Sequence, residues 1–210
     1  MLKNNIEKLF LLFLFISIGV ASFSQETEYK IDYLHDTIKT HKTVAILPFN
    51  ISISYQGFPR NTNDFINTSQ EVRLGDYLQS EMFTYLSQRN SNYSVTFQNI
   101  DTTNTLLRKA NLIFKDDKIT KTLICKLLKV DAIILCSCNF VKTLNRKESL
   151  SSRLSEKIRS GDFAMQVEGG NTGMLLWRLS NKMNKKTFSS VNYIIEDIMK
   201  LVGTNFPYEK

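Results

Sequence analysis

The residue types that most often perform chemistry in proteins are sparse in this chain. Its two histidines, His35 and His41, lie in a polar stretch without patterned carboxylates beside them. The sequence has no Gly-x-Ser-x-Gly, His-Glu-x-x-His, Walker or dinucleotide-binding motif. Two adjacent carboxylate pairs, 116–117 and 196–197, fall where solvated surface is expected. We therefore expect no enzyme activity, no catalytic residues, no cofactor and no metal site.

Three cysteines allow a few kinds of chemistry. Cys136 and Cys138 are two positions apart in an apparent strand, so they share one face, where a disulfide between them would be strained. No second cluster supplies the remaining ligands of a zinc site. We expect Cys125, Cys136 and Cys138 to be small buried side chains. A disulfide that involves Cys125, or a redox or metal role, is the alternative.

The amino-terminal residues have the pattern of a secretory signal peptide. Two lysines flank a short polar start, the stretch Leu9–Val20 is almost wholly apolar, and Ser22 and Ser24 fit a cleavage site before Gln25. The apolar stretch is shorter than the ~20 residues of a membrane span. No cysteine stands near the exit, so we expect residues 1–24 to be removed and the chain to reach the periplasm or the exterior without a lipid anchor. An uncleaved anchor is the alternative.

Composition predicts one globular domain with a soluble surface. The chain has 210 residues, of which 42% are hydrophobic and 22% charged, and its formal charge is +7. The basic residues are densest between 141 and 161, which is therefore the best candidate for a partner-binding surface, with ordinary surface as the alternative. Aromatic residues are not interleaved there, so we expect no nucleic-acid partner. The candidate residues are Lys142, Arg146, Lys147, Arg153, Lys157 and Arg159.

Apolar periodicity predicts an α/β (α+β) fold, with a single-domain mixed sheet of about five strands flanked by helices, over residues 43–208. A polar lead-in at 25–42 could add a short strand. Pro48 suggests a bulge or a switch of pairing within the first strand, and Trp177 is expected in the core. We expect strands at 43–55, 93–98, 131–140, 162–168 and 174–183.

Helix signals lie between these strands. We expect the first helix to begin at a Thr68–Glu71 capping box and the second at Asp101. A third is expected at 118–129, and a short amphipathic helix between Val141 and Gly161 that includes Ile158. The last is expected to begin at Ser189 or Ser190 and to end before Gly203.

Four motifs occur in the order TVAILPF, LLKVDAIIL, TGMLLW and NFPY across residues 43–208. In this the chain resembles a group of envelope proteins that includes the TolB amino-terminal domain, the curli secretion channel CsgG and LpoB-like activators of cell-wall synthases. The resemblance implies a non-enzymatic α/β module that docks onto partners in the assembly of the cell envelope or a surface structure. Two features depart from the group: the lipidated cysteine is absent, and no segment alternates as a membrane-inserted hairpin would.

The function that we predict is binding of an envelope protein or cell-wall component, with no membrane span after removal of the signal peptide and with self-association left open. The alternative is a ligand-binding or enzymatic α/β domain of unrecognised chemistry. An exposed apolar or basic patch, or an unpaired strand edge, would favour partner binding. A cleft lined by ionisable residues would favour the alternative.

Overall fold

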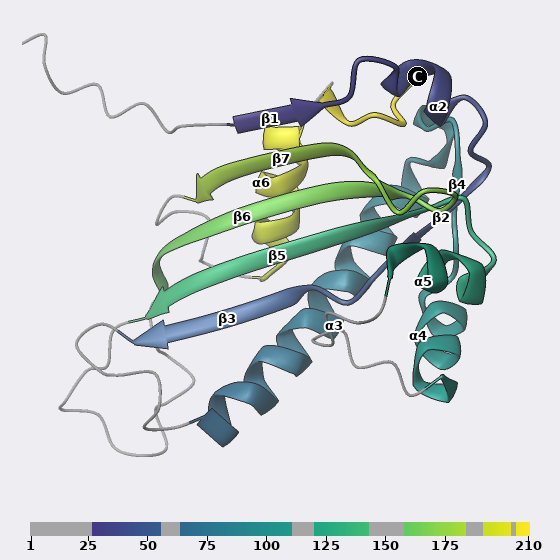
Figure 1. The fold of residues 1–210 in the computed structure, drawn as a ribbon. Coiled ribbons are helices and arrows are strands. Elements are labelled where there is room, and N and C mark those ends of the chain that lie inside the picture. The colour runs from purple at the N-terminus through teal and green to yellow at the C-terminus, as the bar shows by residue number, and fades with distance from the viewer. Residues whose placement is uncertain (1–26, 56–63, 111–119, 143–157, 184–190, 203–204) are drawn as a thin grey trace, which may run out of the picture.

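The computed structural model describes residues 27–55, 64–110, 120–142, 158–183, 191–202 and 205–210. Within them, one mixed sheet of seven strands is flanked by helices (Figure 1). This confirms the α/β class, although about five strands were expected. The strand order is β1-β7-β6-β5-β2-β4, and β3 also pairs with β5.

The strands and helices have the following bounds. The strands are β1 (Thr27–Lys30), β2 (Thr43–Ile46), β3 (Asn50–Tyr55), β4 (Thr96–Phe97), β5 (Ala132–Lys142), β6 (Ile158–Gly169) and β7 (Leu175–Met183). The helices are α2 (Leu34–Ile38), α3 (Asp64–Gln88), α4 (Ile100–Lys109), α5 (Lys121–Leu128) and α6 (Val191–Val202). Strands β2, β3 and β4 run parallel to their neighbours, whereas β1, β5, β6 and β7 form antiparallel pairs.

The first predicted strand is present as two strands, β2 and β3, separated at Pro48. Ile46 lies opposite Ile134 and Asn50 lies opposite Ser137, so this side of the ladder has one more residue than β5. Because side chains alternate between the faces of a sheet, the extra residue exchanges the two faces at that point. One face therefore collects alternate residues before and after the break, which are Val44, Ile46, Phe49, Ile51 and Ile53.

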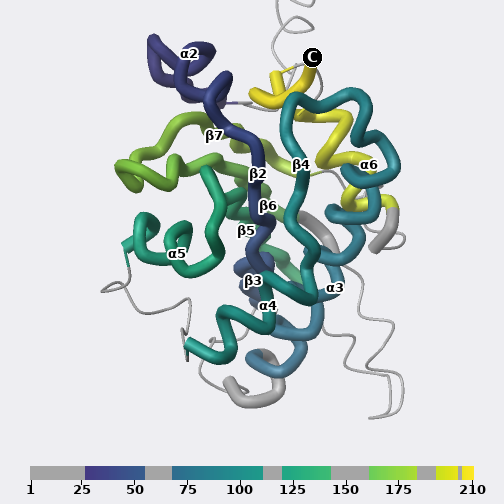
Figure 2. The backbone as a smooth tube through the Cα atoms, turned by 90° about the vertical axis from the view of Figure 1, so that its right-hand side faces the viewer, coloured from purple at the N-terminus to yellow at the C-terminus, as the bar shows by residue number. Residues whose placement is uncertain are grey.

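The two faces of the sheet are covered unequally. Figure 2 shows α3 and α6 on one side of the sheet and α5 on the other. The face toward α3 and α6 holds the larger core, which includes Trp177, Phe163 and Phe140. The other face has a small core that involves α4, α5 and the beginning of β5, with Ile133 at its centre.

Away from α4 and α5, the second face of the sheet is polar and no described helix covers it. We call it the open face; it is turned toward the viewer in Figure 1. Because β3, β5, β6 and β7 place alternate residues there, it carries mostly hydroxyl, amide and charged side chains. They are Asn50, Ser52, Ser54, Ser137, Asn139, Asp162, Gln166, Arg178, Ser180 and Lys182.

The polar lead-in joins the sheet, because β1 pairs with β7 at the sheet edge. Ile31 continues this pairing through its backbone N–H, which donates to the Leu176 carbonyl at 3.1 Å, and its side chain lies in the core. Trp177 is fully buried, as predicted, and its Nε1–H donates to Glu28 Oε1 of β1 at 3.0 Å. Residues 27–42 therefore pack as part of the same fold.

Two predicted helix starts are wrong. Helix α3 begins at Asp64, before Thr68, and Glu71 caps no helix: its Oε1 accepts the Ile53 N–H at 2.8 Å, at the free edge of β3. Helix α4 is capped by Asn99, whose side chain accepts the Asp101 and Thr102 N–H groups. Glu71 instead accepts an N–H at a strand edge, and the side chain of Asn99 caps α4 in place of Asp101.

Other predicted elements are shorter than expected, are of another type, or lie partly outside the described residues. The predicted strand at 93–98 is only β4, and Tyr93 forms an isolated bridge with Glu209. Ile158 begins β6 rather than belonging to a helix, because it pairs with Lys142. Helix α6 is present, but Ser189, Ser190 and Gly203 lie outside the described residues, as do the signal peptide and residues 143–157. Among the described helices, none has the length and apolar composition needed to cross a membrane.

Candidate partner surface and pocket

The predicted basic surface lies mostly outside the described residues. Lys142 ends β5 and is half-buried, and Arg159 lies at the irregularity in β6 between Ile158 and Ser160, so the two come from neighbouring strands. The other four candidates, Arg146, Lys147, Arg153 and Lys157, are not described. This surface therefore stays a prediction. Of the two carboxylate pairs, only 196–197 is described, and there Glu196 is exposed on α6.

All three cysteines are free and buried, which confirms the leading expectation for them. Burial raises the pKa of the Cys125 thiol to about 12 and also raises the pKa of Cys136 and Cys138. The thiolate is the reactive and metal-binding form, so these side chains behave as small apolar groups at neutral pH. No cluster of three or more His, Cys, Asp or Glu side chains suited to a metal occurs among the described residues.

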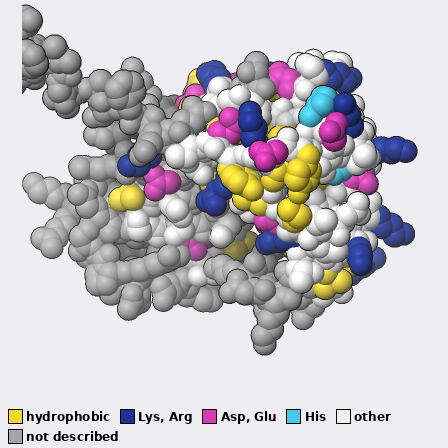
Figure 3. All heavy atoms as spheres, turned by 45° about the horizontal axis from the view of Figure 1, so that its top comes forward, with side chains coloured by type: hydrophobic (Ala, Val, Ile, Leu, Met, Phe, Trp, Pro, Cys, Tyr) yellow, Lys and Arg dark blue, Asp and Glu magenta, His cyan; other side chains and the backbone are white. Residues whose placement is uncertain are grey.

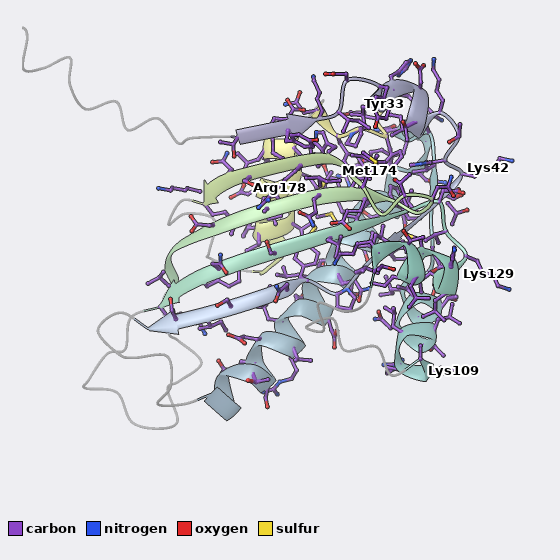
Figure 4. The ribbon with its side chains drawn as sticks, in the orientation of Figure 1. Tyr33, Lys42, Lys109, Lys129, Met174 and Arg178 are labelled. Atoms are coloured by element: carbon purple, nitrogen blue, oxygen red, sulfur yellow. The ribbon has the colours of Figure 1, made fainter. Side chains whose placement is uncertain are left out.

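A group of residues suited to protein contact lies where β1 and β7 meet. Arg178 faces the open side, since its neighbours Trp177 and Leu179 are buried on the other, and Tyr29 is its partner across the strands. Tyr33 and Met174 lie near each other at the end of these strands (Figure 4). Hydrophobic side chains gather on this part of the surface, with charged residues around them (Figure 3). We call Tyr29, Tyr33, Met174 and Arg178 the docking surface.

The docking surface combines exposure with an unpaired strand edge. Tyr29, Tyr33 and Met174 are 49%, 54% and 44% exposed, respectively. Strand β1 is exposed along its whole length and has β7 as its only partner within the described residues. At the opposite side of the sheet, α3 protects the edge of β3, where Glu71 and the Gly75 carbonyl accept backbone N–H groups. Among the described residues, the β1 edge is therefore exposed, whereas the β3 edge is covered by α3.

A pocket of about 680 Å³ lies where the open face meets the helices. Its floor is formed by β3, β5 and β6, and its walls come from α3, α4 and the first residue of α5. The lining is largely apolar, with Leu107 and Leu135 among its residues. Its polar and charged lining residues are Asn50, Thr68, Glu71, Asp76, Asn104, Arg108, Lys121, Ser137 and Gln166.

The charges of the pocket are not neutralised in pairs. Arg108 and Lys121 make no ion pair within the part of the chain that the structure describes. Burial raises the pKa of Asp76, while the positive charge of Arg108 acts in the opposite direction. The Glu71 carboxylate is occupied by the Ile53 N–H. The pocket thus contains two cations, Arg108 and Lys121, and two carboxyl groups, Glu71 and Asp76, of which Asp76 is harder to ionise than usual.

Buried amide bonds fix the walls of the pocket. Gln79 of α3 and Asn104 of α4 bond each other reciprocally at 2.9 and 3.0 Å, and Gln79 also donates to the Ile46 carbonyl at 2.7 Å. Gln98 similarly donates to the Leu128 carbonyl at the end of α5 and accepts from Thr103 of α4. Because α3, α4 and α5 are each tied to a neighbour, the shape of the pocket is set by the fold.

His41 belongs to a structural cluster at the end of β2. Its Nδ1 lies 2.8 Å from the Tyr208 hydroxyl, and Asp131 accepts the backbone N–H groups of Lys42 and Thr43. Burial lowers the pKa of His41, although the charge of Asp131 counteracts it. These groups join the carboxy-terminal residues to β2 and β5, and they do not line the pocket.

Glu168 is the one described residue with a buried side-chain oxygen that has no hydrogen-bond partner. Its Oε1 accepts from Gln166 at 2.9 Å, whereas Oε2 is unpartnered. Burial raises the pKa of this carboxyl, and the charge of Lys121 reduces the effect. The carboxylate is therefore less favourable in the folded state than in the unfolded chain.

Glu168 should make the free energy of unfolding depend on pH in a defined direction. Because its folded pKa is raised above the ordinary value of 4.5, its contribution is complete below that pH and is lost as the pH rises through the folded pKa. Glu168→Gln should remove this pH-dependent part of the free energy of unfolding. Urea unfolding of both proteins between about pH 4 and pH 8 measures it.

The comparison also has a control. His41, with its lowered pKa, contributes stability that falls as the pH drops below 6.5, but both proteins contain it, so it cancels in their difference. Glu196→Gln on α6, where the side chain is exposed, is the control for the substitution itself and should change the free energy of unfolding by less than about 0.5 kcal/mol. A difference between wild type and Glu168→Gln that is constant with pH would refute the assignment.

The residues of the docking surface and of the pocket were not predicted from the sequence. The docking surface joins the lead-in to a strand that begins more than a hundred positions later, and the pocket draws residues from six elements. The available signals were weak: Tyr29 and Tyr33 are aromatic residues in a polar stretch, and Lys121 is a cation in the first turn of a helix, where the helix dipole disfavours it.

No family model and no curated protein matches the chain. Its fold is similar to the LpoB C-terminal domain from Salmonella enterica (11% identity, 72% of this chain and 92% of that chain, TM-score 0.36). The fold is also similar to lipoprotein GNA1162 from Neisseria meningitidis (6% identity, 78% of this chain and 98% of that chain, TM-score 0.40). A third similar structure is the PelC dodecamer from Paraburkholderia phytofirmans (9% identity, 86% of this chain and 95% of that chain, TM-score 0.36). At these identities the likeness concerns the fold alone.

Proposed function

We propose that this chain is an exported, non-enzymatic protein of the cell envelope that binds a partner protein through its docking surface. The observation that carries the proposal is the exposure of Tyr29, Tyr33 and Met174 beside Arg178, next to the edge of β1 that no other described strand pairs with. Tyrosine, methionine and arginine are enriched in the buried centres of protein interfaces. A partner strand could add to β1 while these side chains contact its neighbours.

The extent of the surface suits a contact with a folded partner or an extended segment. From Met174 to Arg178 the chain covers roughly 13 Å at about 3.3 Å per residue. Arg178 supplies a charged group beside the aromatic rings, which an acidic or carbonyl group of the partner can satisfy. Tyrosine loses little side-chain entropy on binding because it has only two side-chain torsions.

Export to the periplasm or beyond is supported by the sequence of the first 24 residues, and the envelope setting by the order of the four sequence motifs. The partner class that follows is an envelope protein or a cell-wall component, not a nucleic acid. The chemistry of the three cysteines agrees with a binding role, because their buried thiols are held in the unreactive form.

The test is chemical crosslinking of the full-length, tagged protein in living cells, followed by its purification and identification of the attached envelope component. Tyr33→Ser should reduce the recovery of that component roughly tenfold or more, the effect of removing one central interface side chain. Arg178→Glu should reduce it further by reversing the charge.

A matched control exists on the other side of the molecule. Tyr193 on α6 is also 54% exposed but lies on the face of the sheet opposite to the docking surface. Tyr193→Ser should leave recovery of the component unchanged. Equal recovery with Tyr33→Ser and Tyr193→Ser would rule out the docking surface as the binding site.

A further inference from the structure

We propose that the pocket between the open face and α3, α4 and α5 binds a short peptide that ends in a free carboxylate, held by Arg108 and Lys121. This site is separate from the docking surface and goes beyond the proposed function. The volume of about 680 Å³ lies within the roughly 300–1,000 Å³ typical of small-ligand pockets, which excludes a folded domain as the occupant.

The two cations specify the negative end of the ligand. Arg108 and Lys121 line one pocket from two different helices, and neither forms an ion pair within the described residues. A guanidinium group forms paired hydrogen bonds with a carboxylate, and an ammonium group adds a further charge.

The position of Lys121 supports an anionic ligand independently. Helix α5 has no acidic residue in its first turn, and Lys121 is its first residue. The positive end of the helix dipole disfavours a lysine there and favours an anion. Burial raises the pKa of the nearby Glu168 carboxyl, while the charge of Lys121 lowers it. An anion in the pocket would relieve this arrangement.

The rest of the lining specifies a peptide rather than an inorganic anion. Leu107 and Leu135 offer an apolar contact for a side chain. Asn50, Asn104 and Gln166 supply amide groups, which can each donate to and accept from a peptide bond. A purely inorganic anion would use the cations and leave the apolar part of the pocket unfilled.

The amide network gives the pocket its preorganisation. The reciprocal Gln79–Asn104 bonds hold Asn104 at the wall before any ligand arrives. Because these walls are tied to the sheet through the Ile46 carbonyl, binding need not order them. Preorganisation makes even a small ligand measurable at moderate concentration.

The experiment titrates the full chain with N-acetylalanylleucine and with its carboxy-terminal amide by isothermal calorimetry. The free acid should bind at least about tenfold more tightly than the amide, because only the acid forms charge-assisted hydrogen bonds. Arg108→Gln and Lys121→Gln should each weaken binding of the acid by roughly tenfold. In nuclear magnetic resonance spectra, the side-chain amides of Asn50 and Gln166 should shift.

Lys109 provides the matched control, since it follows Arg108 on the same helix but does not line the pocket and points to solvent (Figure 4). Lys109→Gln should bind the peptide as the wild type does. So should Tyr33→Ser, which separates this site from the docking surface. The proposal is overturned if acid and amide bind equally, if Arg108→Gln matches Lys109→Gln, or if inorganic phosphate binds as tightly as the peptide acid.

Discussion

Replacement of Gly75 by alanine is expected to lower the free energy of unfolding by about 3 kcal/mol, the upper end of the usual cost of overpacking. Gly75 lies inside α3, where alanine is normally the better residue by about 1 kcal/mol. Here an added Cβ would collide with the Phe49 carbonyl oxygen, a backbone atom that cannot rotate away. The Phe49 N–H also donates to the Gly75 carbonyl at 3.3 Å, so α3 and the break between β2 and β3 are in direct backbone contact.

Urea unfolding, followed by circular dichroism, measures this effect. Ser87→Ala is the control, because Ser87 is exposed on the same helix and its replacement should change stability by less than about 0.5 kcal/mol. If Gly75→Ala were as stable as the wild type, α3 could not lie against the strand break as described. The opposite signs expected from helix propensity and from the collision make the result decisive.

The break between β2 and β3 shows which features of the fold could be predicted from the sequence and which could not. The apolar residues predicted the strand, and Pro48, which has no N–H to donate, predicted a bulge or a switch of pairing; both are present. The packing of Gly75 against the break was not predictable, because a glycine within a helix gives no sign of what its missing side chain would meet. The period of apolar residues in a segment indicates its secondary structure, but it does not indicate which backbone atoms of another element pack against that segment.

The polar capping groups were misassigned for a related reason. Glu71 was predicted to cap a helix by its spacing from Thr68, yet it accepts a backbone N–H from the edge of β3. An unpaired strand edge is a tertiary feature, and a buried backbone donor must find an acceptor wherever one is available. Likewise, seven strands were found instead of about five partly because β1 lies in the polar lead-in, where all four of its residues are exposed and show no apolar alternation.

An exposed patch or strand edge was expected to favour partner binding, and a cleft lined by ionisable residues was expected to favour ligand binding. The molecule has both features, in different places. The edge of β1, which is unpaired within the described part of the chain, and the exposed aromatic residues favour partner binding, whereas the pocket contains ionisable residues that favour ligand binding. The two sites lie along the same open face, one toward β1 and β7 and the other beside α4 and α5. A protein that binds a partner and a small ligand on one sheet face can couple the two only if one ligand changes the affinity for the other.

Replacement of Tyr208 by alanine is expected to lower the free energy of unfolding by about 4 kcal/mol, as for other large aromatic deletions from a core. Tyr208 is fully buried near the end of the chain and packs edge-to-face against Phe206, with ring centroids 5.8 Å apart. Its hydroxyl lies 2.8 Å from His41 Nδ1, and its carbonyl accepts the Ser94 N–H at 2.8 Å. The side chain thus joins residues from both ends of the described chain.

A second variant separates packing from hydrogen bonding. Tyr208→Phe keeps the ring but leaves the buried His41 nitrogen without its partner, so it should cost only about 1–2 kcal/mol. Tyr193→Ala on α6 removes a tyrosine that is 54% exposed and should change stability by less than about 0.5 kcal/mol. If Tyr208→Ala cost no more than Tyr193→Ala, the carboxy-terminal residues would not be packed in the core. If instead Tyr208→Phe were as damaging as Tyr208→Ala, the bond to His41 would outweigh the packing of the ring, and the carboxy-terminal residues would be held chiefly by polar contacts.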